Sequence, residues 1–541
     1  MNRRTLIKGA LTGISSLYLP RIFGHSILNT ETFQPTWASL AQYNVPEWYR
    51  NAKFGIWAHW GPQCEPEYGD WYARNMYIEG SSQYKYHLQK YGHPSKFGFK
   101  DVIHQWKADQ WDPEYLVSLY KQTGARYFFA MANHHDNLDL WNSSHHSWNS
   151  VKVGPKKDLI GGWAKAARKN NLPFGVSVHA AHAWTWYEPA QRADATGEFA
   201  GLPYDGKLTK ANGSGAWWQG MDPQGLYAQN HPLSENAADN HGIHKQWNWD
   251  NGAAIPSKAY CELFLKRTIE LIDKYEPELI YFDDTVLPFH NINNVGLQIA
   301  AHHYNQSIKR NKGKLQAVLN GKILDEMQRK CMVWDIERGQ SNVIEPFTWQ
   351  TDTCIGGWHY DQRVYNDKRY KTAKTVVQTL VDVVSKNGNL LLNIPVKGNG
   401  AIDDQEKAIL EELAAWMKIN AECIFDTRPW KVYGEGPAME DAAPLSAQGF
   451  NEGKGKPLGA TDLRFTTKGD VLYAVVFGWP DDGKVKIKSL ATGKGLRPQA
   501  INKITMLGGG ELSFTQNEEA LTITLPQNRP QLQYAVALKI N

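Results

Sequence analysis

The sequence predicts an α/β protein in which a (β/α)8-like TIM barrel is followed by a C-terminal antiparallel β-sandwich. Three observations lead to this fold class. Strand-like and helix-like patterns alternate from about residue 45 to 430, polar and acidic residues follow directly after the strand-like segments, and short alternating segments replace this pattern after Trp430. Repeated βα units imply parallel strands, whose C-terminal ends form the functional rim of such a barrel.

The clearest strand is the apolar segment 278–284, which ends in the two acids Asp283 and Asp284. A pattern of apolar residues at helical spacing precedes it, and Pro277 ends that helix. Side chains alternate between the two faces of a strand, so Tyr281 and Asp283 share one face while Asp284 lies on the other. We therefore expect Asp283 to point into the barrel beside Tyr281.

Further βα units are expected on both sides of this strand. Strands are predicted at residues 54–59, 126–133, 173–180 and 389–394, and helices at 161–169, at 370–384 and from Asp112 and Pro113 to Gly124. Residues 190–255 are rich in Gly, Asn, Asp and Trp and predict a long loop insertion on the functional rim. Its tryptophans either line a glycan cleft or anchor the loop to the barrel, and they are Trp217, Trp218, Trp247 and Trp249.

The C-terminal region predicts a separate domain. Short alternating segments are typical of an antiparallel sandwich, and they lie at residues 462–466, 471–477, 484–487, 521–524 and 533–537, after a Gly- and Ala-rich linker. The expected domains are therefore a barrel over residues 31–435, with the insertion near 190–255, and a β-sandwich over 445–541.

The composition excludes some classes of partner. The 541-residue chain carries 59 basic and 55 acidic side chains, a net charge of +4, and lacks the basic run that nucleic acid or an anionic membrane would require. Its 22 Trp and 25 Tyr residues suit either the stacking of sugar rings or a large aromatic core. Five scattered cysteines without a CxxC pair argue against a disulfide scaffold and against a structural zinc site.

The N-terminal 30 residues predict an export signal of the twin-arginine type. Arg3 and Arg4 precede a weakly apolar stretch at residues 9–19, which is too short to span a bilayer as a stable helix. We therefore expect an exported, periplasmic protein without a membrane span. The alternative is a basic tail before an unremarkable segment.

Five motifs follow one another in the order found in a known enzyme family. They are Lys-Phe-Gly-Ile-Trp-Ala-His-Trp-Gly at 53–61, His-His-Asp at 134–136 with Trp141 and the run 148–158, Tyr-Phe-Asp-Asp at 281–284, the segment 383–393, and Thr-Arg-Pro-Trp at 427–430. Together they resemble glycoside hydrolase family 29, the retaining α-L-fucosidases, across residues 45–437. The resemblance implies a hydrolase that releases terminal α-L-fucose from a glycan through a covalent glycosyl-enzyme, with two carboxyl groups and no cofactor.

The resemblance also implies roles for individual residues. Asp283 matches the nucleophile, whereas Asp284 stands where the family usually has Gly and is expected to lie behind the site. The residues expected to contact the sugar lie in or next to the matching motifs and are His59, Trp60, Asp70, Trp71, His134, His135 and Tyr281. At Asp70 the family has Glu, so this contact is one methylene shorter here.

The acid/base has to come from another part of the chain. The segment 334–339 resembles the region that supplies the acid in one branch of the family, which favours Glu337, with Glu345 as the alternative. A Trp-Glu pair of other members reads Trp349-Gln350 here, and an amide cannot act as an acid. The general acid needs a raised pKa, from burial or from the charge of the nucleophile.

Two departures from the family pattern concern the substrate. Lys322 stands in the sugar-binding run where the family has Arg, and His179 belongs to a predicted strand that usually carries Tyr-Tyr-Ser but here reads Ser177-Val178-His179. Both are expected to contact the substrate. A histidine in place of an apolar contact could bind the C6 hydroxyl that fucose lacks, so an α-L-galactosidase acting on L-galactose-containing glycans is the alternative function.

Two other readings are weaker. His134, His135 and Asp136 are rich in metal ligands, but neighbouring strand residues point to opposite faces, so we expect no metal site. A glycan-binding protein without catalysis would lack the nucleophile or the acid, and both Asp283 and Glu337 are present. The expected partner is thus a fucosylated oligosaccharide or polysaccharide, and an oligomer is compatible with the sequence.

Overall fold

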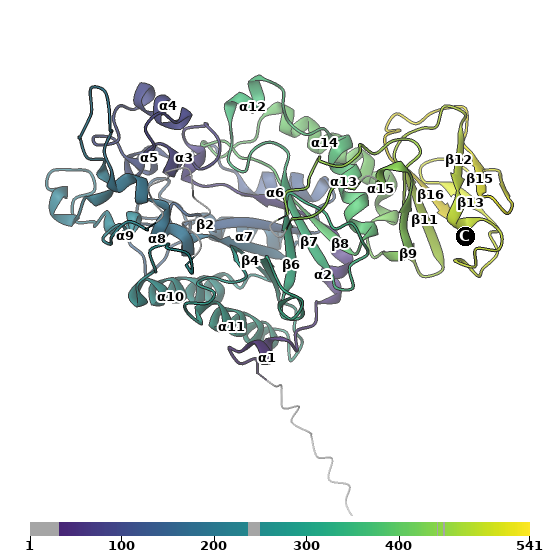
Figure 1. The fold of residues 1–541 in the computed structure, drawn as a ribbon, viewed down its shortest axis with the longest axis horizontal. Coiled ribbons are helices and arrows are strands. Elements are labelled where there is room, and N and C mark those ends of the chain that lie inside the picture. The colour runs from purple at the N-terminus through teal and green to yellow at the C-terminus, as the bar shows by residue number, and fades with distance from the viewer. Residues whose placement is uncertain (1–31, 236–248, 441, 447–448) are drawn as a thin grey trace, which may run out of the picture. The chain divides into compact units, whose positions relative to one another are not determined.

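The structure is a computed structural model that describes residues 32–235, 249–440, 442–446 and 449–541. The predicted export signal at residues 1–30 and Trp247 lie outside these residues. Eight parallel strands form a closed barrel in chain order, which confirms the predicted fold (Figure 1). They are β1 (Phe54–Ala58), β2 (Tyr127–Asn133), β3 (Phe174–Val178), β4 (Leu279–Thr285), β5 (Val318–Lys322), β6 (Val333–Glu337), β7 (Trp349–Cys354) and β8 (Gly388–Asn393).

The barrel closes where β8 pairs with β1, with Phe54 opposite Leu390. Every residue of β1, β2, β3, β5, β7 and β8 is buried. Parallel strands covered on both faces read as nearly continuous apolar runs, which explains why β1, β2, β3 and β8 were recognisable in the sequence, whereas the more polar β5 and β7 were not predicted as strands. Polar residues interrupt the runs at several places, including Gln350 and Asn389 near the starts of β7 and β8 and Asn133 and Asn393 at the ends of β2 and β8.

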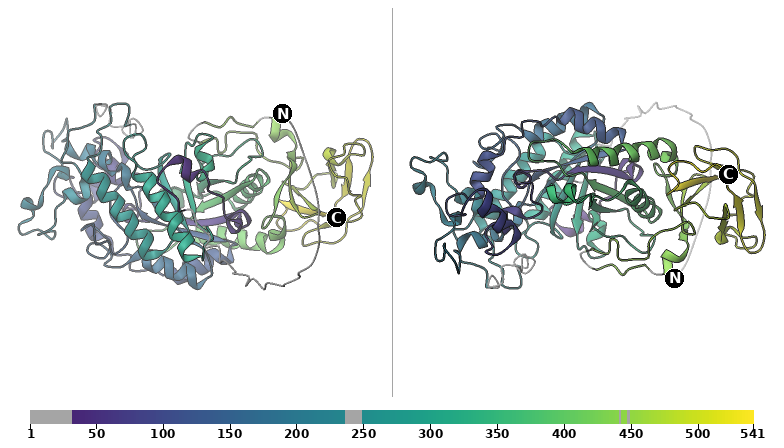
Figure 2. Two further views of the ribbon diagram at one scale, coloured as in Figure 1. Left: turned by 90° about the horizontal axis from the view of Figure 1, so that it is seen from below. Right: turned by 90° about the horizontal axis from the view of Figure 1, so that it is seen from above.

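The helices lie around the strands (Figure 2). The longer ones are α4 (Ser82–Lys90), α6 (Pro113–Gln122), α7 (Leu159–Lys169), α10 (Lys258–Tyr275), α11 (Val295–Arg310), α13 (Ala373–Ser385) and α14 (Asp404–Asn420), and the shorter ones are α1 (Trp37–Leu40), α2 (Glu47–Ala52), α3 (Tyr72–Asn75), α5 (Phe99–Gln105), α8 (Ala183–Trp186), α9 (Gln224–Tyr227), α12 (Gln362–Asn366) and α15 (Pro437–Glu440). The predicted start of α6 is confirmed, since the Asp112 side chain accepts from the Tyr115 N–H and Pro113 is the first helical residue. No described helix is long and apolar enough to cross a membrane.

Two antiparallel sheets make up the C-terminal region. One has the order β13-β16-β11-β10-β9 and the other β12-β15-β14. Their strands are β9 (Arg428–Glu435), β10 (Leu463–Lys468), β11 (Val471–Val476), β12 (Lys484–Ile487), β13 (Ile504–Met506), β14 (Phe514–Gln516), β15 (Leu521–Thr524) and β16 (Val536–Ile540). The β9 strand was assigned to the barrel domain of residues 31–435, yet it pairs with β10, so the C-terminal sheet begins at Arg428 rather than at 445.

The predicted insertion lies between β3 and β4 and contains short helical turns: η3 (Glu188–Gln191), η4 (Asp205–Lys207), η5 (Lys210–Gly213) and α9. Its described tryptophans anchor it. Trp217 stacks on His104 of α5 with ring centroids 4.1 Å apart, and Trp249 stacks on His182 at 5.3 Å. Trp218 is buried. None of these three lines the cavity described below.

A buried ion pair connects α10 to the segment after β2. The Arg267 guanidinium donates from Nε and Nη2 to the Asp139 carboxylate at 3.0 and 2.5 Å, and from Nη1 to Asn137 Oδ1 at 2.8 Å. Both charged side chains are buried. Because residues 134–139 continue directly from β2, this pair also holds His134 and His135 in place.

Arg267→Leu should destabilise the protein strongly, because it leaves the Asp139 carboxylate buried without its cation. Breaking one partner of a buried ion pair costs about 3–5 kcal/mol of unfolding free energy. Thermal unfolding followed by circular dichroism measures the effect, with Lys266→Leu, an exposed neighbour on α10, as the matched control. An unfolding midpoint equal to that of the control would show that the pair does not hold this segment.

Candidate active site

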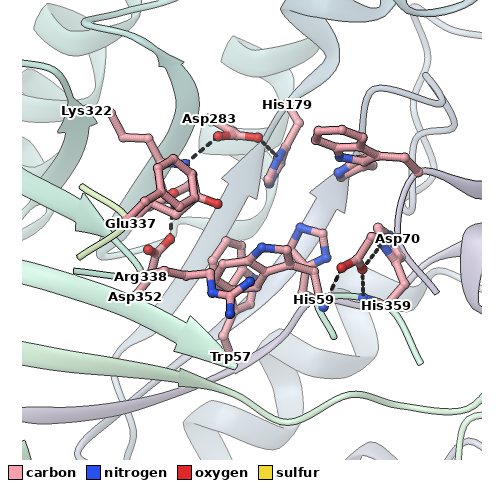
Figure 3. Close-up of a pocket in the computed structure, with 15 residues that line it drawn as sticks. Trp57, His59, Asp70, His179, Asp283, Lys322, Glu337, Arg338, Asp352 and His359 are labelled. Carbon is pink, nitrogen blue, oxygen red and sulfur yellow. Dashed lines mark hydrogen bonds and ion pairs between the residues drawn. The ribbon is translucent and has the colours of Figure 1, made fainter. Parts of the chain in front are cut away.

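A cavity of about 320 Å³ opens at the C-terminal ends of the barrel strands (Figure 3). This is the rim where such barrels carry their active sites. It is lined by residues from or just after seven strands and from three loops: Trp57, His59, Asp70, Trp71, His134, His179, Tyr281, Asp283, Lys322, Glu337, Arg338, Asp352, Trp358, His359 and Phe450. Nine of the residues predicted from the sequence are in this set.

Lys322 joins the two acids that the sequence nominated. Its Nζ lies 2.6 Å from Asp283 Oδ1 and 2.5 Å from Glu337 Oε2 (Figure 3). The three residues come from the neighbouring strands β4, β5 and β6. Asp283 Oδ1 and Glu337 Oε2 both contact the Lys322 Nζ, so these two oxygens are at most about 5 Å apart. This distance suits the separation of about 5–5.5 Å between the two carboxyl groups of retaining glycosidases.

Asp283 is held as a carboxylate. Its Oδ2 lies 3.2 Å from His135 Nε2 and 3.2 Å from His179 Nδ1. Burial alone would raise the pKa of Asp283, but the Lys322 ammonium and the hydrogen bonds from the two imidazoles outweigh burial and keep that pKa well below its ordinary value. Lys322 in turn has a raised pKa, because its surrounding carboxylates outweigh burial. This geometry therefore places the ionised Asp283 nucleophile beside the Lys322 cation.

Asp284 faces away from the cavity, as the alternation along the strand predicts. Its Oδ1 lies 2.7 Å from His182 Nε2, and both side chains are buried. Burial raises the pKa of Asp284, although His182 opposes the shift. The two adjacent acids therefore have different surroundings, and Asp283 alone lines the cavity.

His134 presents a hydrogen-bond donor to the cavity. Gln63 accepts from the Ala73 N–H through Oε1, so its Nε2 donates to Asp136 Oδ2 and to His134 Nδ1, at 3.1 and 2.7 Å. With Nδ1 accepting, a neutral His134 carries its proton on Nε2. The His59 and His179 rings lie next to it, with centroids 5.1 and 4.9 Å away. Such a group of imidazoles can donate to and accept from neighbouring hydroxyls.

The same histidines raise the question of a metal. The donor atoms of His59, His134 and His179 lie within 4.8 Å of one another, and so do those of His135, His179 and Asp283. The sequence suggested only His134-His135-Asp136, so this grouping across strands was not foreseen. A ligating nitrogen must be unprotonated, and Gln63 favours the His134 tautomer with its proton on Nε2. The residues thus fit hydrogen bonding better than metal binding.

Three predicted residues do not line the cavity. Trp60 is buried among Trp106, Trp111 and Trp163 and donates from Nε1 to the Lys397 carbonyl at 2.8 Å, so its expected contact with the sugar is wrong. His135 lies behind Asp283. The alternative acid, Glu345, accepts from Ser341 Oγ at 2.5 Å and lies 3.7 Å from Arg329, outside the cavity.

Asp70 shapes the cavity through the backbone. Its carboxylate accepts from the N–H groups of His359 at 2.6 Å and Trp358 at 3.2 Å. It therefore positions two lining residues that sequence reasoning missed, because they lie in a loop after β7 without periodicity. Trp57 was also missed, although it shares the inward face of its strand with His59 and could have been found from that alternation.

Asp352 lies in the C-terminal half of β7 and lines the cavity, although the sequence assigned it no role. Its Oδ2 accepts from the Tyr281 hydroxyl at 2.7 Å. Burial, and to a smaller extent the charges of Glu337 and Asp283, raise the pKa of Asp352 to about 7 despite the opposing Lys322 ammonium. Asp335 lies deeper, accepts from Gln350 Nε2 at 2.7 Å, and has a pKa raised by burial and by Asp352. The cavity floor therefore carries acids that favour their neutral form.

Comparison with known proteins shows which family the chain belongs to. The chain matches the family described as Alpha-L-fucosidase over residues 23–422 and the Alpha-L-fucosidase C-terminal domain over residues 457–541. It is 27% identical to the tissue alpha-L-fucosidase of Rattus norvegicus over 92% of this chain and 89% of that protein, and 26% identical to that of Homo sapiens over the same shares.

Solved structures share the fold. A Thermotoga maritima alpha-fucosidase in complex with fucose superposes with a TM-score of 0.66 at 23% identity and covers 94% of this chain and 100% of that one. A Thermotoga maritima alpha-L-fucosynthase gives a TM-score of 0.66 at 24% identity with the same coverage. These names do not favour the α-L-galactosidase alternative. The match over residues 23–422 spans most of the 541 residues, and the chain therefore belongs to the α-L-fucosidase family of glycoside hydrolases.

Proposed function

We propose that the protein is an exo-acting retaining α-L-fucosidase, which removes terminal α-L-fucose from fucosylated glycans through a covalent glycosyl-enzyme. The observation that carries this proposal is the Lys322 bridge, which keeps the oxygens of Asp283 and Glu337 within about 5 Å of each other. That separation suits direct attack by one carboxylate and leaves too little room for the water of an inverting enzyme.

In the first step, Asp283 attacks the anomeric carbon while Glu337 gives its proton to the glycosidic oxygen. The bond from the sugar to the leaving group breaks and an ester to Asp283 forms. In the second step Glu337 takes a proton from water, the water oxygen attacks the same carbon, and the ester breaks. Lys322 keeps Asp283 ionised before the attack and stabilises the charge that returns to it afterwards.

The lining of the cavity supports fucose as the sugar. Trp57 and Trp358 place their rings 5.6 Å apart at the cavity wall and offer an apolar surface for a C6 methyl group. The imidazoles of His59, His134 and His179 offer donors and acceptors for the ring hydroxyls. The Arg3-Arg4 segment supports export to the periplasm as part of the same proposal.

Asp283→Gly tests the nucleophile. It should abolish turnover of nitrophenyl α-L-fucoside, because no carboxylate remains to attack, and added azide should restore turnover by entering the space left behind. Release of nitrophenol is the measurement, with Asp284→Gly as the matched variant that azide does not affect. The wild type should prefer the fucoside to nitrophenyl α-L-galactoside. Activity left in Asp283→Gly without azide would contradict the assignment.

Glu337→Gln tests the acid/base. The first step with a good leaving group hardly needs protonation, so kcat/KM for nitrophenyl α-L-fucoside should fall little. For a natural fucosylated glycan it should fall by about 10²–10⁴-fold, the usual contribution of general acid catalysis. Steady-state kinetics on both substrates gives the comparison, and Glu345→Gln should change neither value. Equal losses on both substrates would argue against Glu337.

A further inference from the structure

A short segment from the connection between the barrel and the C-terminal sheets lies against the end of β6. This linker segment, residues 449–452, follows the backbone of Glu337 and Arg338. The Phe450 N–H donates to the Glu337 carbonyl at 2.9 Å, and the Glu452 N–H donates to the Arg338 carbonyl at 3.0 Å. Gly449 forms a parallel bridge with Glu337. The segment thus extends the barrel sheet beside the proposed acid/base.

Side chains fix the linker segment in this position. The Asn451 amide accepts from the Gln340 N–H at 2.7 Å and donates to the Gln340 carbonyl at 3.0 Å. Glu452 accepts from Lys371 Nζ at 2.6 Å and from Thr353 Oγ1 at 2.7 Å. Gln340, Lys371 and Thr353 belong to three different parts of the barrel domain. The segment is therefore fixed in place beside the site.

Gly449 makes the close approach feasible. Its φ is +101°, and a Cβ at this position would lie 2.3 Å from the Glu337 carbonyl oxygen. A side chain there would separate the linker segment from β6. The next residue, Phe450, is thereby delivered to the cavity in a defined position.

Phe450 itself is not explained by packing. It has a φ of 55°, an uncommon backbone conformation for a bulky residue, and its side chain is 37% exposed while lining the cavity. A positive φ at a residue other than glycine costs free energy, and such residues cluster at functional sites. An exposed apolar ring in such a conformation points to a ligand that covers it.

The position of Glu337 indicates which ligand this is. The proposed function places the glycosidic oxygen within hydrogen-bond reach of Glu337. The ring of the leaving group is bonded to that oxygen, so it must lie next to residues that flank Glu337 at the cavity. Arg338 and Phe450 are such residues, because Arg338 follows Glu337 in the chain and Phe450 of the linker segment pairs with the Glu337 backbone. The proposed function places fucose on the opposite side, between Asp283 and the histidines.

We propose that Phe450 forms a subsite for the leaving group, where its ring stacks on the apolar face of the pyranose to which fucose is linked. The neighbouring Arg338 side chain, 45% exposed, offers N–H donors for hydroxyls of the same ring. This inference rests on the proposed function and extends it. It assigns a specificity role to a residue that lies outside the barrel strands.

Two substrates separate this role from any effect on fucose itself. α-L-Fucosyl fluoride has no ring as leaving group, whereas a disaccharide of fucose linked to a second pyranose has one. Phe450→Ala should lower kcat/KM for the disaccharide by about tenfold and leave the value for the fluoride unchanged, which also shows that the variant is folded. Phe347→Ala, at a similarly exposed phenylalanine outside the cavity, is the matched control and should change neither value.

Other outcomes would overturn the inference. An equal loss on both substrates would mean that Phe450 contacts fucose or supports the fold, and no loss on either would mean that it contacts no substrate. Both outcomes leave the proposed function intact as long as the wild type hydrolyses the fluoride. A wild type that hydrolyses neither substrate would sink the proposed function and this inference together.

Discussion

The ammonium group of Lys322 holds the active site together. It lies between the carboxyl groups of Asp283 and Glu337 in a largely buried cavity, where charges interact more strongly than in water. Asp283, Lys322 and Glu337 come from three consecutive strands, so their meeting point depends on the register of the closed barrel. The strand register that closes the barrel therefore also sets the spacing of the catalytic acids.

The surroundings of this bridge show how charge is balanced. The Lys322 cation faces Asp283 and Glu337 directly and is also influenced by Asp352 and Asp335. One cation cannot neutralise four carboxylates. The raised pKa values of Asp352 and Asp335 favour the protonated, neutral form of these two acids. The cavity therefore separates Asp283, which stays ionised beside the cation, from Asp352 and Asp335, which favour their neutral form beneath it.

Much of this arrangement could be predicted from local patterns. Alternation along one strand separated Asp283 from Asp284, and the structure places them on opposite sides as expected. The same alternation could have nominated Trp57. Trp60 was misplaced because a motif match says which residues occur together, whereas the contacts of Trp60 with other tryptophans decide where it packs. Glu337 could be favoured over Glu345 only by resemblance, since strand patterns do not show which acid a loop delivers to a cavity.

Other features depend on contacts between distant segments. β9 was assigned to the barrel because its sequence continues from barrel motifs, but its partner strand β10 lies beyond the linker. Trp358 and His359 owe their place to the hydrogen bonds that their backbone N–H groups donate to Asp70, nearly three hundred residues away. Phe450 reaches the cavity only because Gly449 lets the chain approach β6. No periodicity in the sequence encodes such contacts.

The stereochemistry of hydrolysis tests the central geometry most directly, because the separation of the two carboxyl groups determines the outcome. Proton NMR during the first minutes of nitrophenyl α-L-fucoside hydrolysis shows the anomer that is released before mutarotation. Oxygens held close together by Lys322 predict α-L-fucose as the first product. β-L-Fucose as the first product would contradict the account, since it requires a water molecule between Asp283 and the sugar.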